Sequence, residues 1–106
     1  MTVPTLHAVI KGTGSALPRN RVSNAELAAK IDTTDEWITE RTGIKFRHIA
    51  EPDETTSSLA IEASRNALEA ANMAPSDIDL IILATATPDQ TFPASATIVQ
   101  HALGCN

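Results

Sequence analysis

Trp37 and Arg41 are the two residues whose types and spacing best suit ligand binding, because they stand four positions apart. Side chains at positions i and i+4 share one face of a helix, so an indole and a planar guanidinium would be neighbours there. Each residue alone has a plainer interpretation. A lone tryptophan is most often a half-buried packing anchor, and an arginine near a helix C-terminus is most often a solvated charge that the helix dipole favours.

The single cysteine and the three histidines do not form a pattern typical of catalysis or metal binding. One thiol cannot form an internal disulfide, and the histidines are scattered without metal-ligand spacing. Cys105 follows Gly104, a residue that favours the end of a helix, so we interpret it as a small buried thiol. His7, His48 and His101 are interpreted as surface histidines or hydrogen-bonded core histidines. No metal site is predicted.

Gly12 and Gly14 could suggest a phosphate-binding loop. The sequence lacks, however, the third glycine of a dinucleotide fingerprint and the Gly-Lys-Ser/Thr of a P-loop. The glycines follow an apolar, β-branched stretch from Leu6 to Ile10, which favours a buried strand. We therefore interpret them as the turn that ends this strand.

Composition narrows the possible partners. The 106 residues fit one domain or part of a larger one, and 42% of them are hydrophobic, so the chain can bury a core. A formal net charge of −5 disfavours nucleic acid and anionic membranes as partners. No apolar run approaches the roughly 20 residues that span a bilayer, and no secretory signal is recognisable. We expect a cytoplasmic protein.

Capping signals and periodicity predict helices in four regions. Ser23 and Glu26 form a capping box before a short helix that begins at Asn24. A second short helix is expected from about Thr34 to Arg41, with Thr33 and Glu36 as its capping box. Thr56 or Ser57 is expected to cap a long helix to about Ala71, and a further helix is expected from Ala94 to Leu103. The expected stops are Gly43, Asn72 and Gly104, with Pro93 in the first turn of the last helix.

The apolar run from Asp79 to Thr87, DLIILATAT, predicts a central strand covered on both faces. A short strand is expected between Lys45 and Ala50. The order of strand, helices, strand and helix favours an α/β class with a mainly parallel or mixed sheet covered by helices. The long helix turns an alanine stripe inward, so it can approach a neighbour closely, and Ala63→Leu or Ala67→Leu should cost about 1 to 3 kcal/mol.

The stretch from Asp32 to Ala50, DTTDEWITERTGIKFRHIA, resembles the β-ketoacyl-acyl-carrier-protein synthase III family. Matching segments are GTGSALP at 12–18, DLIILATATPD at 79–89 and TFPASA at 91–96. The resemblance covers essentially the whole chain but only about the first third of such an enzyme. It implies that residues 1–106 are the N-terminal portion of a thiolase-like domain, within the first half of the fold.

By this resemblance, the complete enzyme condenses a short acyl-CoA primer with malonyl-acyl carrier protein and releases carbon dioxide, which initiates fatty acid synthesis. Trp37 and Arg41 would clamp the adenine of coenzyme A, with Thr33 nearby. Lys45 would point toward the coenzyme phosphates. Phe92 would cross a homodimer interface and line the acyl tunnel of the neighbouring subunit; without a partner it could equally be a hydrophobic staple before the last helix.

The resemblance also implies that the catalytic Cys, His and Asn lie outside this chain, so no catalytic residue is assigned here. Coenzyme A enters as a thioester substrate, and no tightly bound cofactor or metal is expected. Two alternatives stay open. One is a related condensing enzyme that primes polyketide or secondary-metabolite synthesis, and the other is a non-catalytic binding or dimerisation module. The second alternative is disfavoured because an isolated buried strand would leave an apolar edge unpaired.

Overall fold

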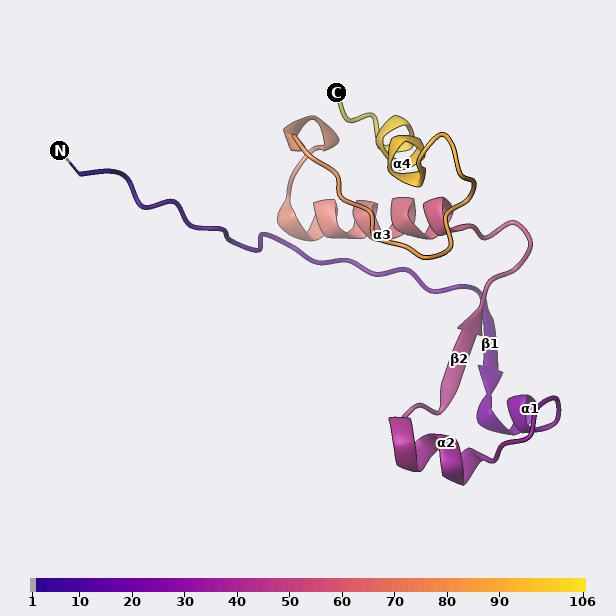
Figure 1. The fold of residues 1–106 in the computed structure, drawn as a ribbon. Coiled ribbons are helices and arrows are strands. Elements are labelled where there is room, and N and C mark those ends of the chain that lie inside the picture. Colours follow the sequence, from indigo (N-terminus) through magenta and orange to yellow (C-terminus); the bar gives the residue numbers. More distant parts are fainter. Residues whose placement is uncertain (1) are drawn as a thin grey trace. The chain divides into compact units, whose positions relative to one another are not determined.

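The computed structural model describes residues 2–106, which fold as two compact units. The first, called here the hairpin unit, is Leu17–Thr55. The second, the helical unit, combines residues 2–16 with Thr56–Asn106. Figure 1 shows the elements of each unit. Each unit has its own small core: Val22 and Ile38 are buried in the hairpin unit, and Val99 is buried in the helical unit.

The hairpin unit is a two-stranded antiparallel sheet that carries two helices in its connection (Figure 1). Strand β1 is Asn20–Ser23 and strand β2 is Phe46–Ile49, with Val22 paired to Arg47. Helices α1, Asn24–Ala28, and α2, Asp35–Thr42, connect the strands. The short strand expected between Lys45 and Ala50 is confirmed as β2. Strand β1 was not expected, because its four residues carry no recognisable alternation.

Local capping explains both helices. Ser23 Oγ accepts a hydrogen bond from the Glu26 backbone N–H, and the Glu26 carboxylate accepts one from the Ser23 N–H, so the expected capping box of α1 is confirmed. For α2 the expected Thr33–Glu36 box is wrong. Thr34 is the N-cap instead, and its Oγ1 accepts from the Trp37 N–H. Gly43 ends α2 with φ of 68°, as expected of a left-handed stop.

The two ends of the hairpin unit are held together by Glu54. Its carboxylate accepts hydrogen bonds from the backbone N–H groups of Arg19 and Glu51, while the Arg19 guanidinium lies 2.7 Å from Asp53 Oδ1. The hydrogen bond from Arg19 is the main reason that the pKa of Asp53 is lowered. Residues 17–55 are therefore closed at their base by interactions from both ends.

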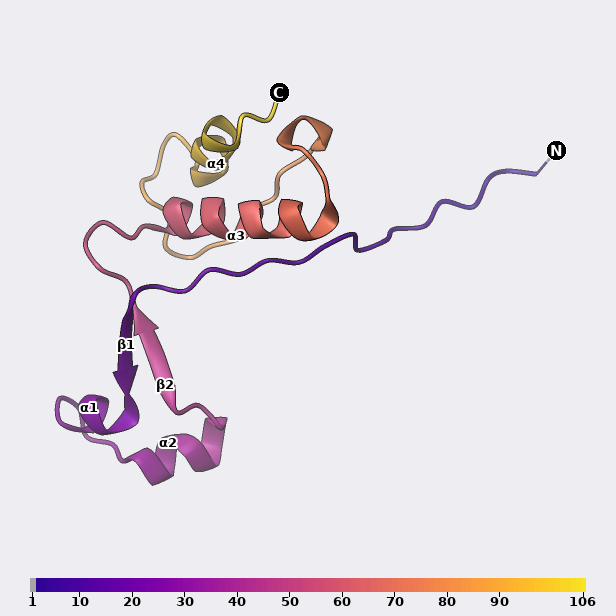
Figure 2. The same ribbon diagram turned by 180° about the vertical axis from the view of Figure 1, so that it is seen from behind.

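The helical unit contains α3, Thr56–Ala71, the 3₁₀ turn η1, Pro75–Asp77, and α4, Ser95–Leu103. Helices α3 and α4 pack together (Figures 1 and 2). The expected cap of α3 by Thr56 or Ser57 is wrong, since both residues already belong to the helix. Instead Asp89, which follows the DLIILATAT segment, accepts from the Ser57 N–H and also from the hydroxyls of Ser57 and Ser95. One carboxylate thus ties together the first turns of α3 and α4.

The ends of these helices follow the expected stops. Asn72 adopts a φ of 53° after α3, and Gly104 adopts 76° after α4. Pro93 was expected inside the first turn of α4. It lies before the N-cap Ala94, so the helix begins one residue later than expected.

Gly12 and Gly14 lie against the backbone of α3, and the segment around them runs along that helix in both views (Figures 1 and 2). A Cβ atom at Gly14 would lie 2.3 Å from the Ala67 nitrogen and 2.4 Å from the Ala63 oxygen. A Cβ atom at Gly12 would lie 2.7 Å from the Ala71 nitrogen. The glycines therefore serve close packing against the alanine stripe.

The two strands expected at 6–10 and 79–87 form no sheet in the described part of the chain. Leu6, Ile10, Leu80 and Ile82 in these segments are all more than 70% exposed. A strand that is buried on both faces needs a hydrogen-bonded neighbour on each side, and residues 2–106 place none beside these segments. The sheet that does form is the antiparallel β1–β2 pair. Over residues 2–106 no helix is long and apolar enough to cross a membrane.

Candidate functional site

Trp37 and Arg41 both lie on α2 and contact each other, as their spacing indicated. The Trp37 ring is not packed into the core, because 53% of the residue's surface is exposed. The guanidinium carbon of Arg41 lies 4.8 Å from the centroid of the indole. Helix α2 holds this arrangement at its N-terminal end, where Thr34 caps the Trp37 N–H at 3.1 Å.

The contact between Arg41 and Trp37 leaves no room for a base between them. Stacked planes approach to about 3.5 Å, so a purine between the two groups would need a gap of about 7 Å. The pair is thus closed in this structure. A flat ligand would reach the indole on a face that Arg41 does not cover, or would displace the Arg41 side chain.

Two hollows in the hairpin unit border the Trp37 ring. The smaller, of about 250 Å³, is lined by Asp32, Thr33, Thr34 and Trp37. The larger, of about 510 Å³, is lined mainly by apolar side chains of both helices and β2; its lining residues are Leu27, Ile31, Thr33, Trp37, Ile38, Arg47, His48 and Ile49. The indole therefore has open space beside it.

Thr33 lines both hollows and contributes a polar atom without a partner. Its Oγ1 is buried and makes no hydrogen bond within residues 2–106. A buried hydroxyl without a partner is destabilising, because it has lost its hydrogen bonds to water. Because this atom is shielded from solvent, a ligand in either hollow would reach it only after the Thr33 side chain turned.

Lys45 lies just before β2 and is directed toward Asp35 of α2. Its Nζ lies 4.0 Å from Asp35 Oδ2, and the Lys45 side chain is 57% exposed. The pKa of Asp35 is lowered, first by a hydrogen bond from Asn24, then by one from Thr39, with the Lys45 charge a smaller cause. Lys45 is therefore close to an acidic partner as well as accessible to solvent.

The network around Asn24 was not found from the sequence. Asn24 is 1% exposed, and its amide reaches α2 and the segment after it. An asparagine directly after an N-cap carries no sequence signal of burial, since this residue type is usually exposed. Its role depends on residues 11 to 20 positions further along the chain.

Phe92 belongs to the helical unit and lies in the segment before α4, where it is 86% exposed. Because its side chain is exposed, Phe92 does not act as a hydrophobic staple for α4 in this chain. Other large apolar side chains of the described residues, such as Leu6 and Ile82, are equally exposed, so the exposure leaves Phe92 accessible without identifying what it contacts.

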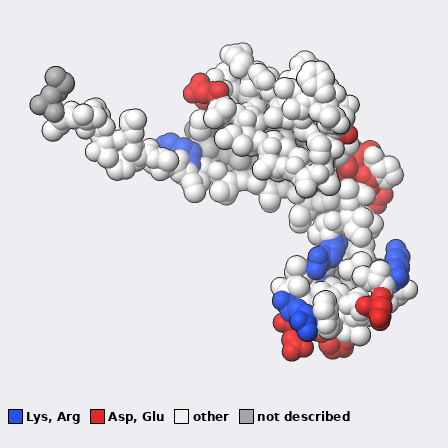
Figure 3. All heavy atoms as spheres, viewed as in Figure 1, with Lys and Arg blue, Asp and Glu red and all other residues white. Residues whose placement is uncertain are grey.

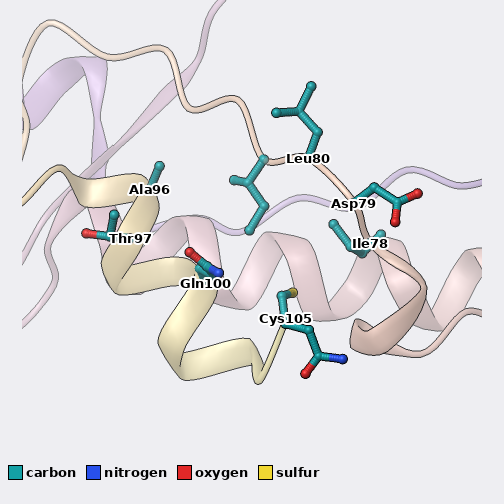
Figure 4. A pocket seen from close by; sticks show the side chains of 9 residues that line it. Ile78, Asp79, Leu80, Ala96, Thr97, Gln100 and Cys105 are labelled. Carbon is teal, nitrogen blue, oxygen red and sulfur yellow. The ribbon is translucent and has the colours of Figure 1, made fainter.

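Cys105 lines a groove of about 270 Å³ between α4 and the segment 78–81 (Figure 4). Figure 4 shows Cys105 near Gln100 and Ile78, and no histidine lines this groove. His48 lies in the hairpin unit, where its Nδ1 is 2.8 Å from the Pro18 carbonyl oxygen. Because a carbonyl can only accept, Nδ1 is the donor. His7 and His101 are exposed.

Charged side chains of both signs lie on the hairpin unit, which also carries Trp37. Most of the Lys and Arg residues belong to the hairpin unit, and on the face in Figure 3 they alternate with acidic groups. Over that face the helical unit is largely uncharged (Figure 3). On this face the hairpin unit therefore offers individual cations rather than a broad basic patch (Figure 3).

Comparisons with known proteins give a consistent result. No family model matches the chain. It is 72% identical over 100 residues to a β-ketoacyl-[acyl-carrier-protein] synthase III of Sphingopyxis alaskensis, a match that covers 94% of this chain and 31% of that protein. The chain thus spans about a third of the length of the curated relatives it matches.

Solved structures agree with these relatives. The 3-oxoacyl-[acyl-carrier-protein] synthase III of Aquifex aeolicus superposes with a TM-score of 0.83 at 50% identity, covering 90% of this chain and 30% of that one. A priming β-ketosynthase from the R1128 polyketide pathway superposes with a TM-score of 0.85 at 41% identity, covering 97% of this chain and 34% of that one. The resemblance to synthase III and the α/β, thiolase-like fold class are confirmed.

Proposed function

We propose that this chain is the coenzyme-binding segment of an acyltransferase. The complete protein would condense a short acyl-CoA primer with malonyl-acyl carrier protein, release carbon dioxide and so initiate fatty acid synthesis. The similarity to synthase III over nearly the whole chain supports this proposal. The Cys, His and Asn that perform the condensation would lie in the part of the protein beyond this segment.

The observation that carries the coenzyme role is the half-exposed Trp37 ring beside an unsatisfied Thr33 hydroxyl. A purine has a flat face for the indole and a polar edge for a hydroxyl, so one ligand would satisfy both groups once the Thr33 side chain turned toward it. Both groups border the same hollow, which is lined by Asp32, Thr33, Thr34 and Trp37. An aliphatic ligand would leave Thr33 Oγ1 without a partner.

Arg41 and Lys45 would supply the positive charges for the coenzyme phosphates. The Arg41 guanidinium lies over the indole, and its N–H groups would bind phosphate oxygens. Lys45 would compete for phosphate against its ion pair with Asp35. Because that pair is at 4.0 Å and largely exposed, the attraction is weak and the lysine can exchange partners.

The test is Trp37→Ala in the full-length protein, with binding of acyl-CoA and of malonyl-acyl carrier protein measured separately. We expect acyl-CoA binding to weaken much more than carrier-protein binding. Phe46→Ala is a matched control. Phe46 is an aromatic residue of the same unit whose ring has the Arg21 guanidinium over it at 3.6 Å, and it lines neither hollow. Equal losses for the two substrates in Trp37→Ala would rule out the adenine role.

A second candidate is a condensing enzyme that primes polyketide synthesis. The similarity to the R1128 priming ketosynthase at 41% identity favours including it. The Trp37 site would bind the same coenzyme in either case, so the distinction depends on the acyl group. A panel of acyl-CoA primers of different length and branching, assayed with the full-length protein, would separate the two.

We further propose that the full-length protein is a homodimer in which Phe92 reaches the acyl tunnel of the neighbouring subunit. The 86% exposure of Phe92 leaves its side chain accessible for such a contact. No metal, nucleic acid or membrane is required for the proposed reaction, and a cytoplasmic location suits a coenzyme A substrate.

A further inference from the structure

Asn24 links three parts of the hairpin unit through one buried amide. Its Nδ2 lies 2.8 Å from Asp35 Oδ1 and 2.8 Å from the Ile44 carbonyl oxygen, with Thr39 Oγ1 at 3.4 Å. Its backbone N–H also donates to the Lys45 carbonyl oxygen at 3.3 Å. The first residue of α1 therefore holds both the body of α2 and the segment that follows it.

The orientation of this amide follows from its partners. An ionised carboxylate and a backbone carbonyl are acceptors only, so the nitrogen of Asn24 must face them. Its Oδ1 is then left buried and without a hydrogen-bond partner in the described part of the chain. An arrangement that leaves one atom unsatisfied points to the two N–H groups as the reason for an asparagine here.

The residues that Asn24 holds lie opposite the ones proposed to bind coenzyme. Asp35 and Thr39 are one turn apart on α2, and the Thr39 hydroxyl donates to Asp35 Oδ1 at 3.2 Å. Trp37 and Arg41 each follow one of these residues by two positions, which is about 200° around a helix with 3.6 residues per turn. The Asn24 network therefore holds the side of α2 that lies opposite the indole and the guanidinium.

We propose that Asn24 is a positioning residue that fixes the rotation of α2, and with it the placement of Trp37 and Arg41. The expected effect on coenzyme A binding rests on the proposed function. The effect on the position of α2 does not depend on that function. With the amide removed, α2 keeps its own cap and its Gly43 stop, and it loses the donors that set its rotation against β1 and β2.

The test uses Asn24→Asp and Asn24→Ala in the full-length protein. Asn24→Asp keeps the size of the side chain and removes its donors, while Asn24→Ala removes both size and donors. Asp35→Asn weakens the same bond from the other side with an isosteric change. Asn66→Ala is the matched control, because Asn66 also donates its amide to a backbone carbonyl, that of Ser15, but in the helical unit.

Two measurements are made on each folded variant. The first is acrylamide quenching of Trp37, which is the only tryptophan of this chain; Trp37→Phe serves as the blank for any other tryptophan in the full-length protein. The second is the dissociation constant for coenzyme A, compared with binding of malonyl-acyl carrier protein. We expect altered quenching and about a tenfold weaker binding of coenzyme A for the Asn24 variants, because the lost hydrogen bond has a charged acceptor.

The two readouts separate this inference from the proposed function. Unchanged quenching in Asn24→Asp, or in Asp35→Asn should the Asn24 variants fail to fold, would overturn the positioning role. That role would also be overturned if Asn66→Ala weakened coenzyme A binding as much as the Asn24 variants do. Changed quenching together with undiminished coenzyme A binding in Trp37→Ala would support the positioning role and reject the coenzyme function.

Discussion

The guanidinium of Arg41 lies over the indole of Trp37, 4.8 Å from the ring centroid, and both residues are exposed on α2. The contact places a fixed positive charge beside a flat aromatic surface. This arrangement suits a ligand that has both a planar base and a phosphate, because each part meets a complementary group.

Arg41→Gln should weaken coenzyme A binding about tenfold, because a charge-assisted hydrogen bond to phosphate is lost. The dependence of the dissociation constant on salt should also become shallower, since one cation fewer contributes to a screened attraction. Titration at low and high salt measures both effects. Arg21→Gln is the control, because the Arg21 guanidinium also lies over an aromatic ring of the hairpin unit, that of Phe46, at 3.6 Å. An unchanged salt dependence in Arg41→Gln would contradict the phosphate role.

Gly14→Ala should destabilise the protein by about 3 kcal/mol or more through overpacking. The new Cβ would lie 2.3 Å and 2.4 Å from backbone atoms of Ala67 and Ala63, which cannot rotate away as a side chain could. Urea unfolding measures the loss. Thr13→Ala, at the exposed position between the two glycines, should change stability little. A Gly14→Ala variant as stable as the parent would show that the segment does not pack on α3.

Stability should fall in acid through Asp35. Hydrogen bonds from Asn24 and Thr39 lower the pKa of this carboxyl in the folded state. A carboxyl with a lowered folded pKa contributes stability above its unfolded pKa of about 3.9, and that contribution is lost as the pH falls through the folded value. Asp35→Asn should therefore be less stable than the parent at pH 7, with a smaller loss below about pH 4.

The measurement for Asp35 is the urea midpoint between pH 7 and pH 3. Glu62→Gln, which removes one exposed carboxylate from α3, controls for the change in net charge. If the parent and Asp35→Asn lost stability in parallel over this range, the hydrogen bonds from Asn24 and Thr39 would not be the source of the acid dependence.

Phe92→Ala should shift primer choice toward longer acyl chains, because a smaller side chain would lengthen the proposed tunnel of the neighbouring subunit. Its effect on the stability of one chain should be small, since the residue is 86% exposed. A panel of acyl-CoA primers assayed with the full-length protein gives the measurement. Unchanged chain-length selectivity would exclude Phe92 from the tunnel.

The helices could be predicted from the sequence because their signals are local. The Ser23–Glu26 box, the Gly43 and Gly104 stops and the alanine periodicity of α3 each act within one or two turns. The contact between Trp37 and Arg41 is equally local, because a spacing of four positions on one helix brings the two side chains together. Chain segments of this kind fold in the same way in many contexts.

Only the tertiary structure determined the features that depend on residues far apart in the sequence, namely strand pairing and the burial of Asn24. The segments 6–10 and 79–87 have strand-like sequences, yet a strand exists only where a neighbour accepts its hydrogen bonds, and the described residues supply none. Asn24 carried no signal in the sequence and became the centre of a buried network because α2 and Ile44 return to it. Burial and long-range pairing are properties of the packed chain, so residue types and local spacing alone could not reveal them.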